Sequence, residues 1–254
     1  PIRLVTIERW AECINGFAWT AKKNLEYVKP VLDPARHTVS RVHNAVPQVE
    51  VEPWAHDLEG IFPEGAFVFA VISRAIEEKG WIETIQAFKS VQRKISGRSL
   101  GLILVGEGAI RPKAEALSKN DPSIQFLGER HDIQGLMAVI SCLVVPSRFP
   151  GESFPMVVLE AMGIGCPIIG TDVGEISEMV VGGDMHPAGL VIEPDPDSMN
   201  FVKLLEQAMF RMLKVNDLAE YRSGSLVRGQ RYSLAAVGQT YVQLYKEIDP
   251  SFTI

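Results

Sequence analysis

Two glutamates eight positions apart, Glu152 and Glu160, are the residues of this chain best suited by type and spacing to do chemistry. The apolar run that ends at Val145 predicts a strand, and a compact apolar helix is expected at 155–163. Glu152 falls just before that helix and Glu160 lies within it. The spacing predicts one acid at the mouth of a cleft and the other a turn or two along its wall. Carboxylates and the free backbone N–H groups at a helix start suit a ligand rich in hydroxyls and phosphates.

The residues around the two acids form a longer pattern. It runs Glu152-Ser153-Phe154-Pro155-Met156-Val157-Val158-Leu159-Glu160-Ala161-Met162, followed by Gly165-Cys166-Pro167. This pattern resembles the E-x7-E signature of family 4 retaining glycosyltransferases of the GT-B fold, the glycosyl transferases group 1. The plain alternative is a surface helix with two solvated acids, which leaves the apolar neighbours in family order unexplained.

The resemblance implies roles for both acids and for the residues between them. In the family the first glutamate binds hydroxyls of the transferred sugar and the second binds the ribose, which is therefore expected of Glu152 and Glu160. A carboxylate suits both tasks because it can accept from two neighbouring hydroxyls. The other donor-binding residues expected in this loop are Ser153, Phe154, Pro155 and Met156.

Two cations follow the apolar run at 67–72. Arg74 and Lys79 would lie at the carboxyl end of that strand, where open α/β sheets bind ligands. The family has Gly-Arg-x4-Lys-Gly here, so the resemblance implies that both cations bind the leaving diphosphate and form the catalytic set with Glu152. Ser73 replaces the family's glycine. The alternative is a solvated turn, in which the cations pair with the two glutamates between them.

Two further loops follow expected strands. Gly106-Glu107-Gly108 is similar to the family's Gly-(Asp/Glu)-Gly loop near the donor nucleotide, and Arg130 stands where members contact the base. A lone Gly-x-Gly is a weak signal, so plain turns stay open as the alternative for both loops. Glu175 replaces the second glycine of the family's Gly-Gly-x-x-Glu element, which places an acid near the cleft or on its rim.

Apolar runs alternate with helical patterns from about residue 66 onward. Because the runs are continuous, they predict strands of a parallel sheet that is covered on both faces. The expected strands are 67–72, 100–105, 124–127, 142–145, 167–169 and 190–192. The expected helices are 80–94, 111–118, 133–140, 155–163, 175–181, 198–213, 218–228 and 235–248. The predicted fold class is α/β, a doubly wound Rossmann-like parallel sheet, which the resemblance identifies with the C-terminal domain of GT-B enzymes.

The first sixty residues differ from the rest. The sequence predicts a strand at 1–5, a helix at 9–27, a strand at 38–42 and a linker at 48–64. The resemblance implies three parts: 1–64, a truncated remnant of the acceptor domain with its linker; 65–230, the nucleotide-sugar-binding domain; and 231–254, a helix that crosses back to the acceptor domain. The chain does not begin with Met, so we expect a fragment that is inactive without its acceptor domain.

Composition limits the classes of partner and cofactor. The 254 residues carry a net charge of -6, which argues against nucleic acid as the main partner. No apolar run approaches the ~20 residues of a spanning helix. The histidines and cysteines lack metal-ligand spacing, and Asp195-Pro196-Asp197 is expected to cap a helix, so no metal and no cofactor are expected. Cysteines in buried strands indicate a reduced, cytoplasmic setting; peripheral contact with the inner membrane face, through the acceptor domain, stays open.

The function implied by the resemblance is transfer of a hexosyl unit from a nucleoside diphosphate sugar to an acceptor hydroxyl, with retention of anomeric configuration and without a divalent metal. The acceptor would be a glycan, a lipid or a small molecule. Two alternatives stay open: a sugar-nucleotide-binding module without transfer activity, and another GT-B reaction such as phosphorolysis or epimerisation. The fold alone does not separate them.

Overall fold

The computed structural model describes residues 4–47, 58–119, 121–183, 186–214 and 218–253. The chain forms two compact units: unit 1 comprises residues 1–48 and 230–254, and unit 2 comprises residues 49–229. Most of the linker expected at 48–64 lies outside the described residues. Its described part contains a 3-10 turn, η2 (Leu58–Gly60).

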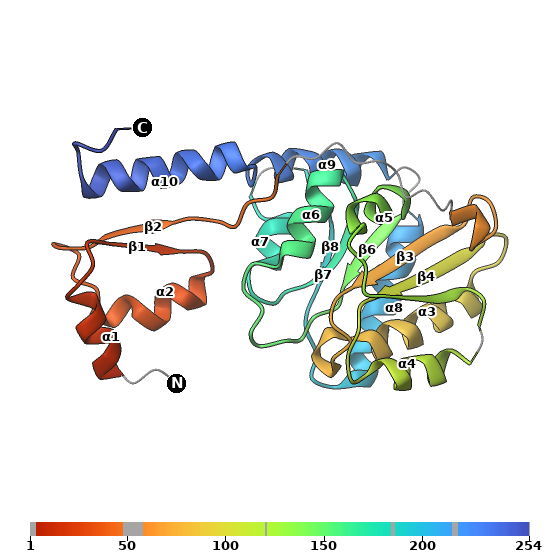
Figure 1. The fold of residues 1–254 in the computed structure, drawn as a ribbon. Coiled ribbons are helices and arrows are strands. Elements are labelled where there is room, and N and C mark those ends of the chain that lie inside the picture. Colours follow the sequence, from red (N-terminus) through yellow and green to blue (C-terminus); the bar gives the residue numbers. More distant parts are fainter. Residues whose placement is uncertain (1–3, 48–57, 120, 184–185, 215–217, 254) are drawn as a thin grey trace. The chain divides into compact units, whose positions relative to one another are not determined.

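Unit 2 is built on a six-stranded parallel sheet (Figure 1). The strands lie in the order β5 (Ile124–Gly128), β4 (Leu100–Val105), β3 (Phe67–Ile72), β6 (Cys142–Val145), β7 (Ile168–Thr171) and β8 (Gly189–Ile192). From β3 the chain winds outward to β4 and β5, and then returns to β6 on the other side of β3. The sheet is therefore doubly wound, with its switch point between β3 and β6, and the predicted fold class is confirmed.

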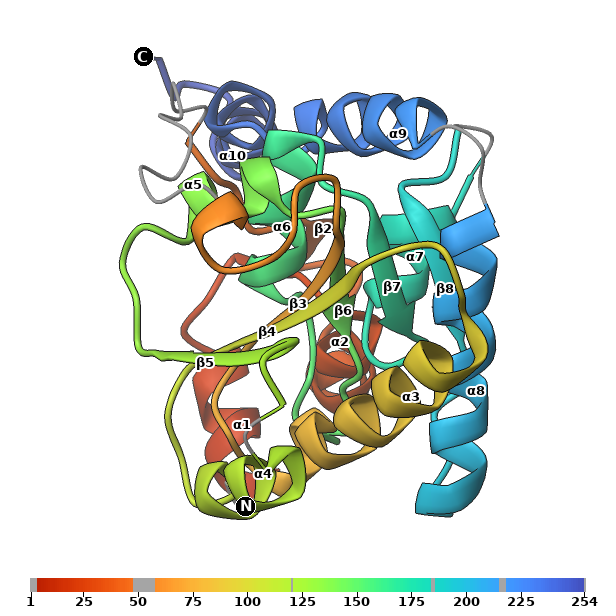
Figure 2. The same ribbon diagram turned by 90° about the vertical axis from the view of Figure 1, so that its right-hand side faces the viewer.

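Helices cover both faces of this sheet. Figures 1 and 2 show α3 (Trp81–Lys94), α4 (Arg111–Ser118) and α8 (Ser198–Lys214) on one face, and α5 (Ile133–Val139), α6 (Met156–Ile164) and α7 (Ile176–Val181) on the other. A 3-10 turn, η3 (Glu77–Lys79), precedes α3, and α9 (Ala219–Gln230) follows α8. Every strand and helix expected in this unit is present, with ends within two residues of the prediction.

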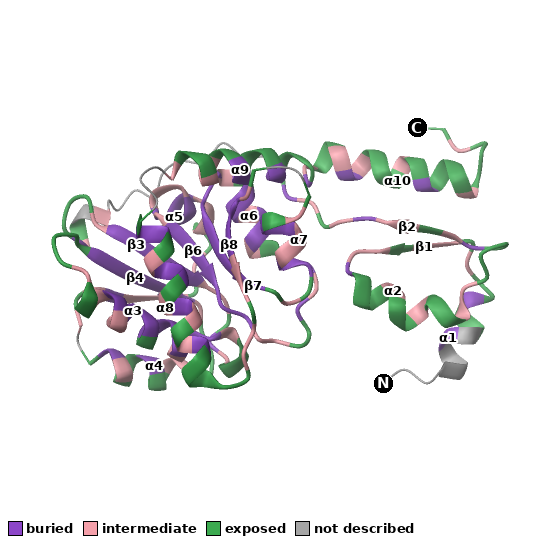
Figure 3. Ribbon diagram, turned by 180° about the vertical axis from the view of Figure 1, so that it is seen from behind, coloured by how far each residue is buried: buried purple, intermediate pink, exposed green. Residues whose placement is uncertain are grey.

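One large core of unit 2 lies between the sheet and the pair α3 and α8. Phe69, Phe88, Leu102, Phe201 and Met209 are all 0% exposed. Figure 3 shows the central strands β3 and β4 buried over almost their whole length, because helices exclude water from both faces. This double covering explains why the strand sequences are continuously apolar.

A buried arginine ties α9 to the end of α7. Arg228 is 1% exposed. Its guanidinium donates hydrogen bonds to the backbone carbonyl oxygens of Met179, Gly182 and His186, at 3.3, 2.8 and 2.7 Å. The last carbonyls of a helix have no partner within the helix and carry partial negative charge. Arg228 therefore both satisfies these oxygens and complements the dipole of α7.

Unit 1 contains a two-stranded parallel sheet, β1 (Gly16–Trp19) beside β2 (Thr38–Arg41). Its helical elements are α1 (Leu4–Ala11), α2 (Lys22–Val28), η1 (Lys29–Val31) and α10 (Leu234–Ile248). Val237 and Leu244 of α10 are buried in a small cluster with Val42, which follows β2. The final helix of the chain is thus part of the same unit as the first strands.

Two predictions for unit 1 are wrong. The described part of the strand expected at 1–5 belongs to α1, where Ile7 and Ala11, four positions apart, are buried on one face. The helix expected at 9–27 is interrupted by β1. Parallel pairing with β2 supplies the backbone of β1 with ladder hydrogen bonds, and this distant partner overrides the local helical pattern. The strand expected at 38–42 is confirmed as β2.

Candidate functional site

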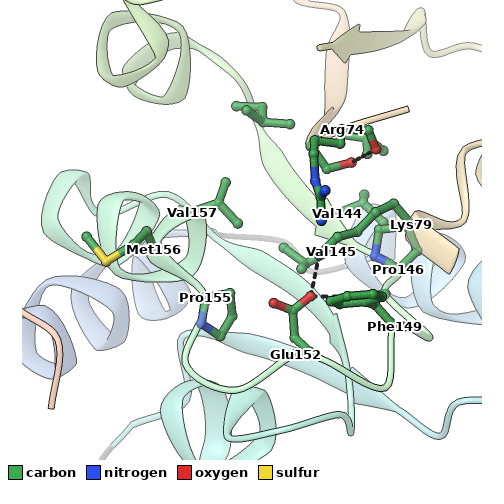
Figure 4. A pocket seen from close by; sticks show the side chains of 14 residues that line it. Arg74, Lys79, Val144, Val145, Pro146, Phe149, Glu152, Pro155, Met156 and Val157 are labelled. Atoms are coloured by element: carbon green, nitrogen blue, oxygen red, sulfur yellow. Dashed lines mark hydrogen bonds and ion pairs between the residues drawn. The ribbon is translucent and has the colours of Figure 1, made fainter. Parts of the chain in front are cut away.

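A cavity of about 270 Å³ opens at the carboxyl edge of the sheet of unit 2 (Figure 4). The ends of β3 and β6 and the start of α6 line it, so it lies at the switch point of the sheet. Doubly wound sheets bind ligands in this crevice because the connections leave the two neighbouring strands toward opposite faces. The polar lining residues are Ser73, Arg74, Lys79, Ser147 and Glu152.

Two cations on the connection from β3 to α3 reach this cavity. Arg74 is exposed and Lys79 is half-buried at the end of η3. The ring centre of Phe149 lies 5.9 Å from the Arg74 guanidinium carbon and 5.5 Å from Lys79 Nζ. The ring attracts both cations, which offsets part of their mutual repulsion. Gly80, at φ 67, lets this turn approach β6 closely, since a Cβ there would lie 2.5 Å from the carbonyl oxygen of Pro146.

Glu152 faces these cations from the loop between β6 and α6. Its carboxylate forms an ion pair with the Lys79 ammonium, and the two side chains are 10% and 15% exposed respectively. The hydroxyl of Ser147, which is fully buried, donates to Glu152 Oε2 at 2.8 Å. Two donors thus compensate a mostly buried charge, as a carboxylate withdrawn from water requires. The sequence separates Lys79 and Glu152 by 73 positions, and the fold brings them together.

The start of α6 forms the opposite wall of the cavity. Pro155 precedes the helix at φ -69, and Met156 and Val157 begin its first turn. Backbone N–H groups of a first turn have no acceptor within the helix, and the helix dipole favours an anion beside them. The cavity therefore offers two cations and a helix start to an anion, and a carboxylate to hydroxyl groups.

Ser73 braces the turn that carries Arg74. The indole N–H of Trp81 donates to Ser73 Oγ at 3.0 Å, and this hydroxyl donates to the carbonyl oxygen of Arg74 at 3.2 Å. Both bonds orient the backbone at the carboxyl end of β3. The serine at the family's glycine position is therefore accommodated as part of the cavity wall.

The loop of Gly106, Glu107 and Gly108 packs against the same turn. A Cβ at Gly106 would lie 2.0 Å from the carbonyl oxygen of Ser73, and one at Gly108 would lie 2.4 Å from that of Ala75. The backbones touch so closely that only glycine fits, and Ala75 N–H donates to the Glu107 carbonyl at 2.8 Å. The Glu107 side chain pairs with an arginine four positions later. None of the three residues lines the cavity, and their donor-binding role stays a prediction.

Glu160 and Arg130 also lie outside the cavity lining. Glu160 is half-buried on α6, where the Gln134 amide donates to its carboxylate at 3.5 Å, and burial raises the pKa of this carboxyl. Both hydrogen bonds from Arg130 to Asp132, at 2.7 and 2.5 Å, raise the pKa of the guanidinium, which stays charged. The structure thus places Glu152 in the cavity and Glu160 about one turn beyond the lining residues of α6.

The comparison with known proteins decides the family. The pattern of the family described as Glycosyl transferases group 1 matches residues 66–209, which is more than half of the chain. The chain belongs to the glycosyl transferases group 1. It is 35% identical over 101 residues to the lipopolysaccharide core biosynthesis mannosyltransferase LpsB of Rhizobium meliloti, across 40% of this chain and 28% of that protein. It is 34% identical over 105 residues to the N-acetyl-alpha-D-glucosaminyl L-malate synthase of Bacillus anthracis, across 40% of this chain and 26% of that protein.

Solved structures resemble this group 1 chain over nearly its whole length. A glycosyltransferase from Rickettsia africae superposes with a TM-score of 0.76 at 17% identity, covering 97% of this chain and 68% of that one. Alr3699/HepE of Anabaena, in complex with UDP and glucose, gives 0.72 at 18% identity, covering 96% and 66%. At these identities the likeness shows the fold alone. The chain spans less than a third of the length of the two sequence relatives named above.

The other predicted residues of the donor loop in this group 1 domain are packed beside the cavity. Phe154 is 4% exposed, and the Ser153 carbonyl accepts a hydrogen bond from Glu175 N–H at 2.8 Å. Pro155 and Met156 line the cavity, whereas Ser153 and Phe154 do not. Glu175 is 4% exposed at the start of α7, so the acid expected near the cleft or on its rim is a buried residue.

The Asp-Pro-Asp sequence of this group 1 chain caps α8, as predicted. Asp197 accepts a hydrogen bond from Asn200 N–H at 2.9 Å, and Asp195 accepts one from Asp197 N–H at 2.8 Å. Within the described ranges, no group of three or more His, Cys, Asp or Glu side chains is placed to hold a metal ion. The described helices also include none that is long and apolar enough to cross a membrane.

Three residues that shape the site were not predicted from the sequence: Ser147, Phe149 and Trp81. A local signal for Ser147 exists, because it is a polar residue two positions after the end of β6, at the edge of the sheet where ligands bind. Phe149 acts through contacts with the two cations of another connection, and Trp81 acts through a side-chain hydrogen bond to Ser73, eight positions earlier. Neither contact has a local sequence pattern.

Proposed function

We propose that this chain binds a nucleoside diphosphate sugar in the cavity and supports transfer of its hexosyl unit to an acceptor hydroxyl, as a family 4 retaining GT-B enzyme. The observation that carries the proposal is the convergence of Arg74, Lys79 and Glu152 at the switch point, beside the start of α6. Cations and a helix start recognise the diphosphate, and a carboxylate recognises sugar hydroxyls.

The size of the cavity indicates which parts of the donor it can enclose. Its volume of about 270 Å³ is slightly below the ~300–1,000 Å³ of pockets that enclose a whole drug-sized ligand. We therefore assign the diphosphate and the sugar to the cavity. The nucleoside would extend outward, the ribose toward Glu160 and the base toward Arg130, past the loop of Gly106 and Gly108.

The charges support a reaction without a divalent metal. As the diphosphate departs, negative charge grows on its oxygens, and Arg74 and Lys79 lie where they can neutralise it. Each charge-assisted contact is worth roughly 1.5–3 kcal/mol, so two of them lower the barrier by several kcal/mol if they form mainly in the transition state. The acceptor hydroxyl would attack on the face from which the diphosphate leaves, and the leaving phosphate would take its proton. This geometry retains the anomeric configuration.

The partners beyond the donor belong to the same proposal. The relatives' names include a mannosyltransferase, and one solved neighbour holds UDP and glucose, which favours a hexosyl donor. The acceptor, whether glycan, lipid or small molecule, would be recognised outside residues 66–209, since the named sequence relatives are much longer than their matched regions. We place the enzyme in the cytoplasm, with any membrane contact made peripherally, at the inner face, by the acceptor domain.

Calorimetric titration of this chain with UDP, GDP and ADP, in the presence of EDTA, tests the proposal. We expect one of them to bind, and Arg74→Ala to weaken that binding by about ten- to a hundredfold, as the loss of one charge-assisted contact predicts. Arg93→Ala is the matched control, because Arg93 is exposed in the last turn of α3, at the opposite edge of the sheet. Absence of binding by a folded chain, or equal effects of the two substitutions, would refute the assignment.

A further inference from the structure

Lys79 has two possible partners in the proposed reaction. In the structure its ammonium pairs with Glu152, whereas the proposed function places it on the diphosphate of the donor. A diphosphate in the cavity draws Lys79 away from the carboxylate. Glu152 is 8% exposed, and a mostly buried carboxylate is costly to leave without a partner. When the ligand is a nucleoside diphosphate without the transferred sugar, a group of the protein can hold Glu152 while Lys79 binds the diphosphate.

Ser147 is placed to do this. It is 0% exposed, and its Oγ lies 2.8 Å from Glu152 Oε2, the oxygen that also pairs with Lys79. Phe149 N–H donates to Ser147 Oγ at 3.3 Å. A hydroxyl has one proton and an ionised carboxylate can only accept, so this proton is directed at Glu152 while Ser147 Oγ accepts from Phe149.

The sheet itself holds Ser147 in position. Thr171, which ends β7 and is 0% exposed, donates from its hydroxyl to the Ser147 carbonyl oxygen at 2.6 Å. Ser147 follows β6, the strand next to β7. Lys79, in contrast, lies at the end of the short turn η3, and its side chain is 15% exposed. The serine is therefore a fixed partner of Glu152, and the lysine is the one that can leave.

We infer that Ser147 is a positioning residue that holds Glu152 while Lys79 transfers from this carboxylate to the diphosphate. The inference rests on the proposed function. Without the serine hydroxyl, Lys79 is the one of these two donors that still binds the Glu152 carboxylate, and the carboxylate holds the lysine more strongly. Loss of Ser147 should then weaken diphosphate binding, although Ser147 donates no bond to the ligand. The weakening should require the negative charge of Glu152.

A double-mutant cycle tests this dependence. The dissociation constants of UDP, GDP and ADP are measured by calorimetry for the wild-type chain, Ser147→Ala, Glu152→Gln and the double variant. We expect Ser147→Ala to weaken binding of the accepted nucleotide by about tenfold, and to have no effect when Glu152→Gln is also present, because a neutral amide does not retain the lysine. Ser225→Ala is the matched control, since Ser225 is also 0% exposed, donates to a backbone carbonyl and lies outside the cavity lining.

The outcomes separate this inference from the proposed function. Binding to the wild-type chain that Ser147→Ala leaves unchanged overturns the inference and leaves the proposed function standing. Equal weakening by Ser147→Ala with and without Glu152→Gln shows a merely structural role and also overturns it. Absence of binding by the wild-type chain overturns both. If Ser147→Ala fails to fold, as judged by circular dichroism, Ser147→Cys replaces it; its weaker donor should give a smaller loss with the same dependence on Glu152.

Discussion

The ion pair between Lys79 and Glu152 should stabilise unit 2 as well as prepare it for a ligand. The side chains are 15% and 10% exposed, so this ion pair is intermediate between a solvent-exposed pair and a fully buried one. Exposed pairs contribute up to ~1 kcal/mol, and removal of one partner from a buried pair costs ~3–5 kcal/mol. Lys79→Met removes the charge and keeps most of the aliphatic stem, while Ser147 still donates to Glu152. We therefore expect the free energy of unfolding to fall by about 2 kcal/mol.

A second substitution tests whether this loss comes from a buried carboxylate that has lost its cation. Adding Glu152→Gln to Lys79→Met removes the negative charge that Lys79 neutralised and should restore about 1 kcal/mol or more, with a coupling energy of similar size. Urea denaturation followed by far-UV circular dichroism gives the free energy of unfolding of the wild type, Lys79→Met, Glu152→Gln and the double variant. Lys94→Met and Glu206→Gln form the matched control cycle, because Lys94 is 58% exposed in its pair with Glu206. A coupling energy for Lys79 and Glu152 no larger than that of the control pair would refute the reasoning.

Three more properties follow from buried groups. Arg228→Met leaves three backbone carbonyl oxygens without their cationic donor. We therefore expect the free energy of unfolding to fall by about 3 kcal/mol and Tm, measured by calorimetry, to fall by about 6–12 °C. A Tm shift near zero would contradict the stabilising role of these three hydrogen bonds. Burial raises the pKa of Glu160, so the folded state binds this proton more tightly than the unfolded state, and stability is lost as pH rises through the raised pKa. Glu160→Gln should therefore exceed the wild type in Tm at about pH 7 and lose this advantage near pH 4; an advantage independent of pH would contradict this cause. Burial raises the pKa of the Cys142 thiol well above its usual value and that of Cys166 to about 12, so a thiol reagent at about pH 8 should modify only the exposed Cys13 in the native chain and all three cysteines after unfolding. Rapid modification of all three in the native chain would show that the buried thiols are accessible.

The elements of unit 2 could be predicted because their signals are local. Apolar runs of three to six residues predict all six strands, and buried strands covered on both faces have this pattern whatever their neighbours are. In unit 1, a distant contact overrides the local signal. The sequence of β1 was assigned to a helix, since only the distant strand β2 makes it extended.

The sequence by itself determined that unit 2 is a doubly wound parallel sheet and that Arg74 and Glu152 follow strand ends. Both must then lie at one edge, because the carboxyl ends of parallel strands share it. Only the tertiary structure decided the pairing of Lys79 with Glu152, the support of that acid by Ser147, and the position of Glu160 beyond the cavity. These depend on β3 lying beside β6 and on the approach of one connection to the other, and the spacing of residues along the chain encodes neither.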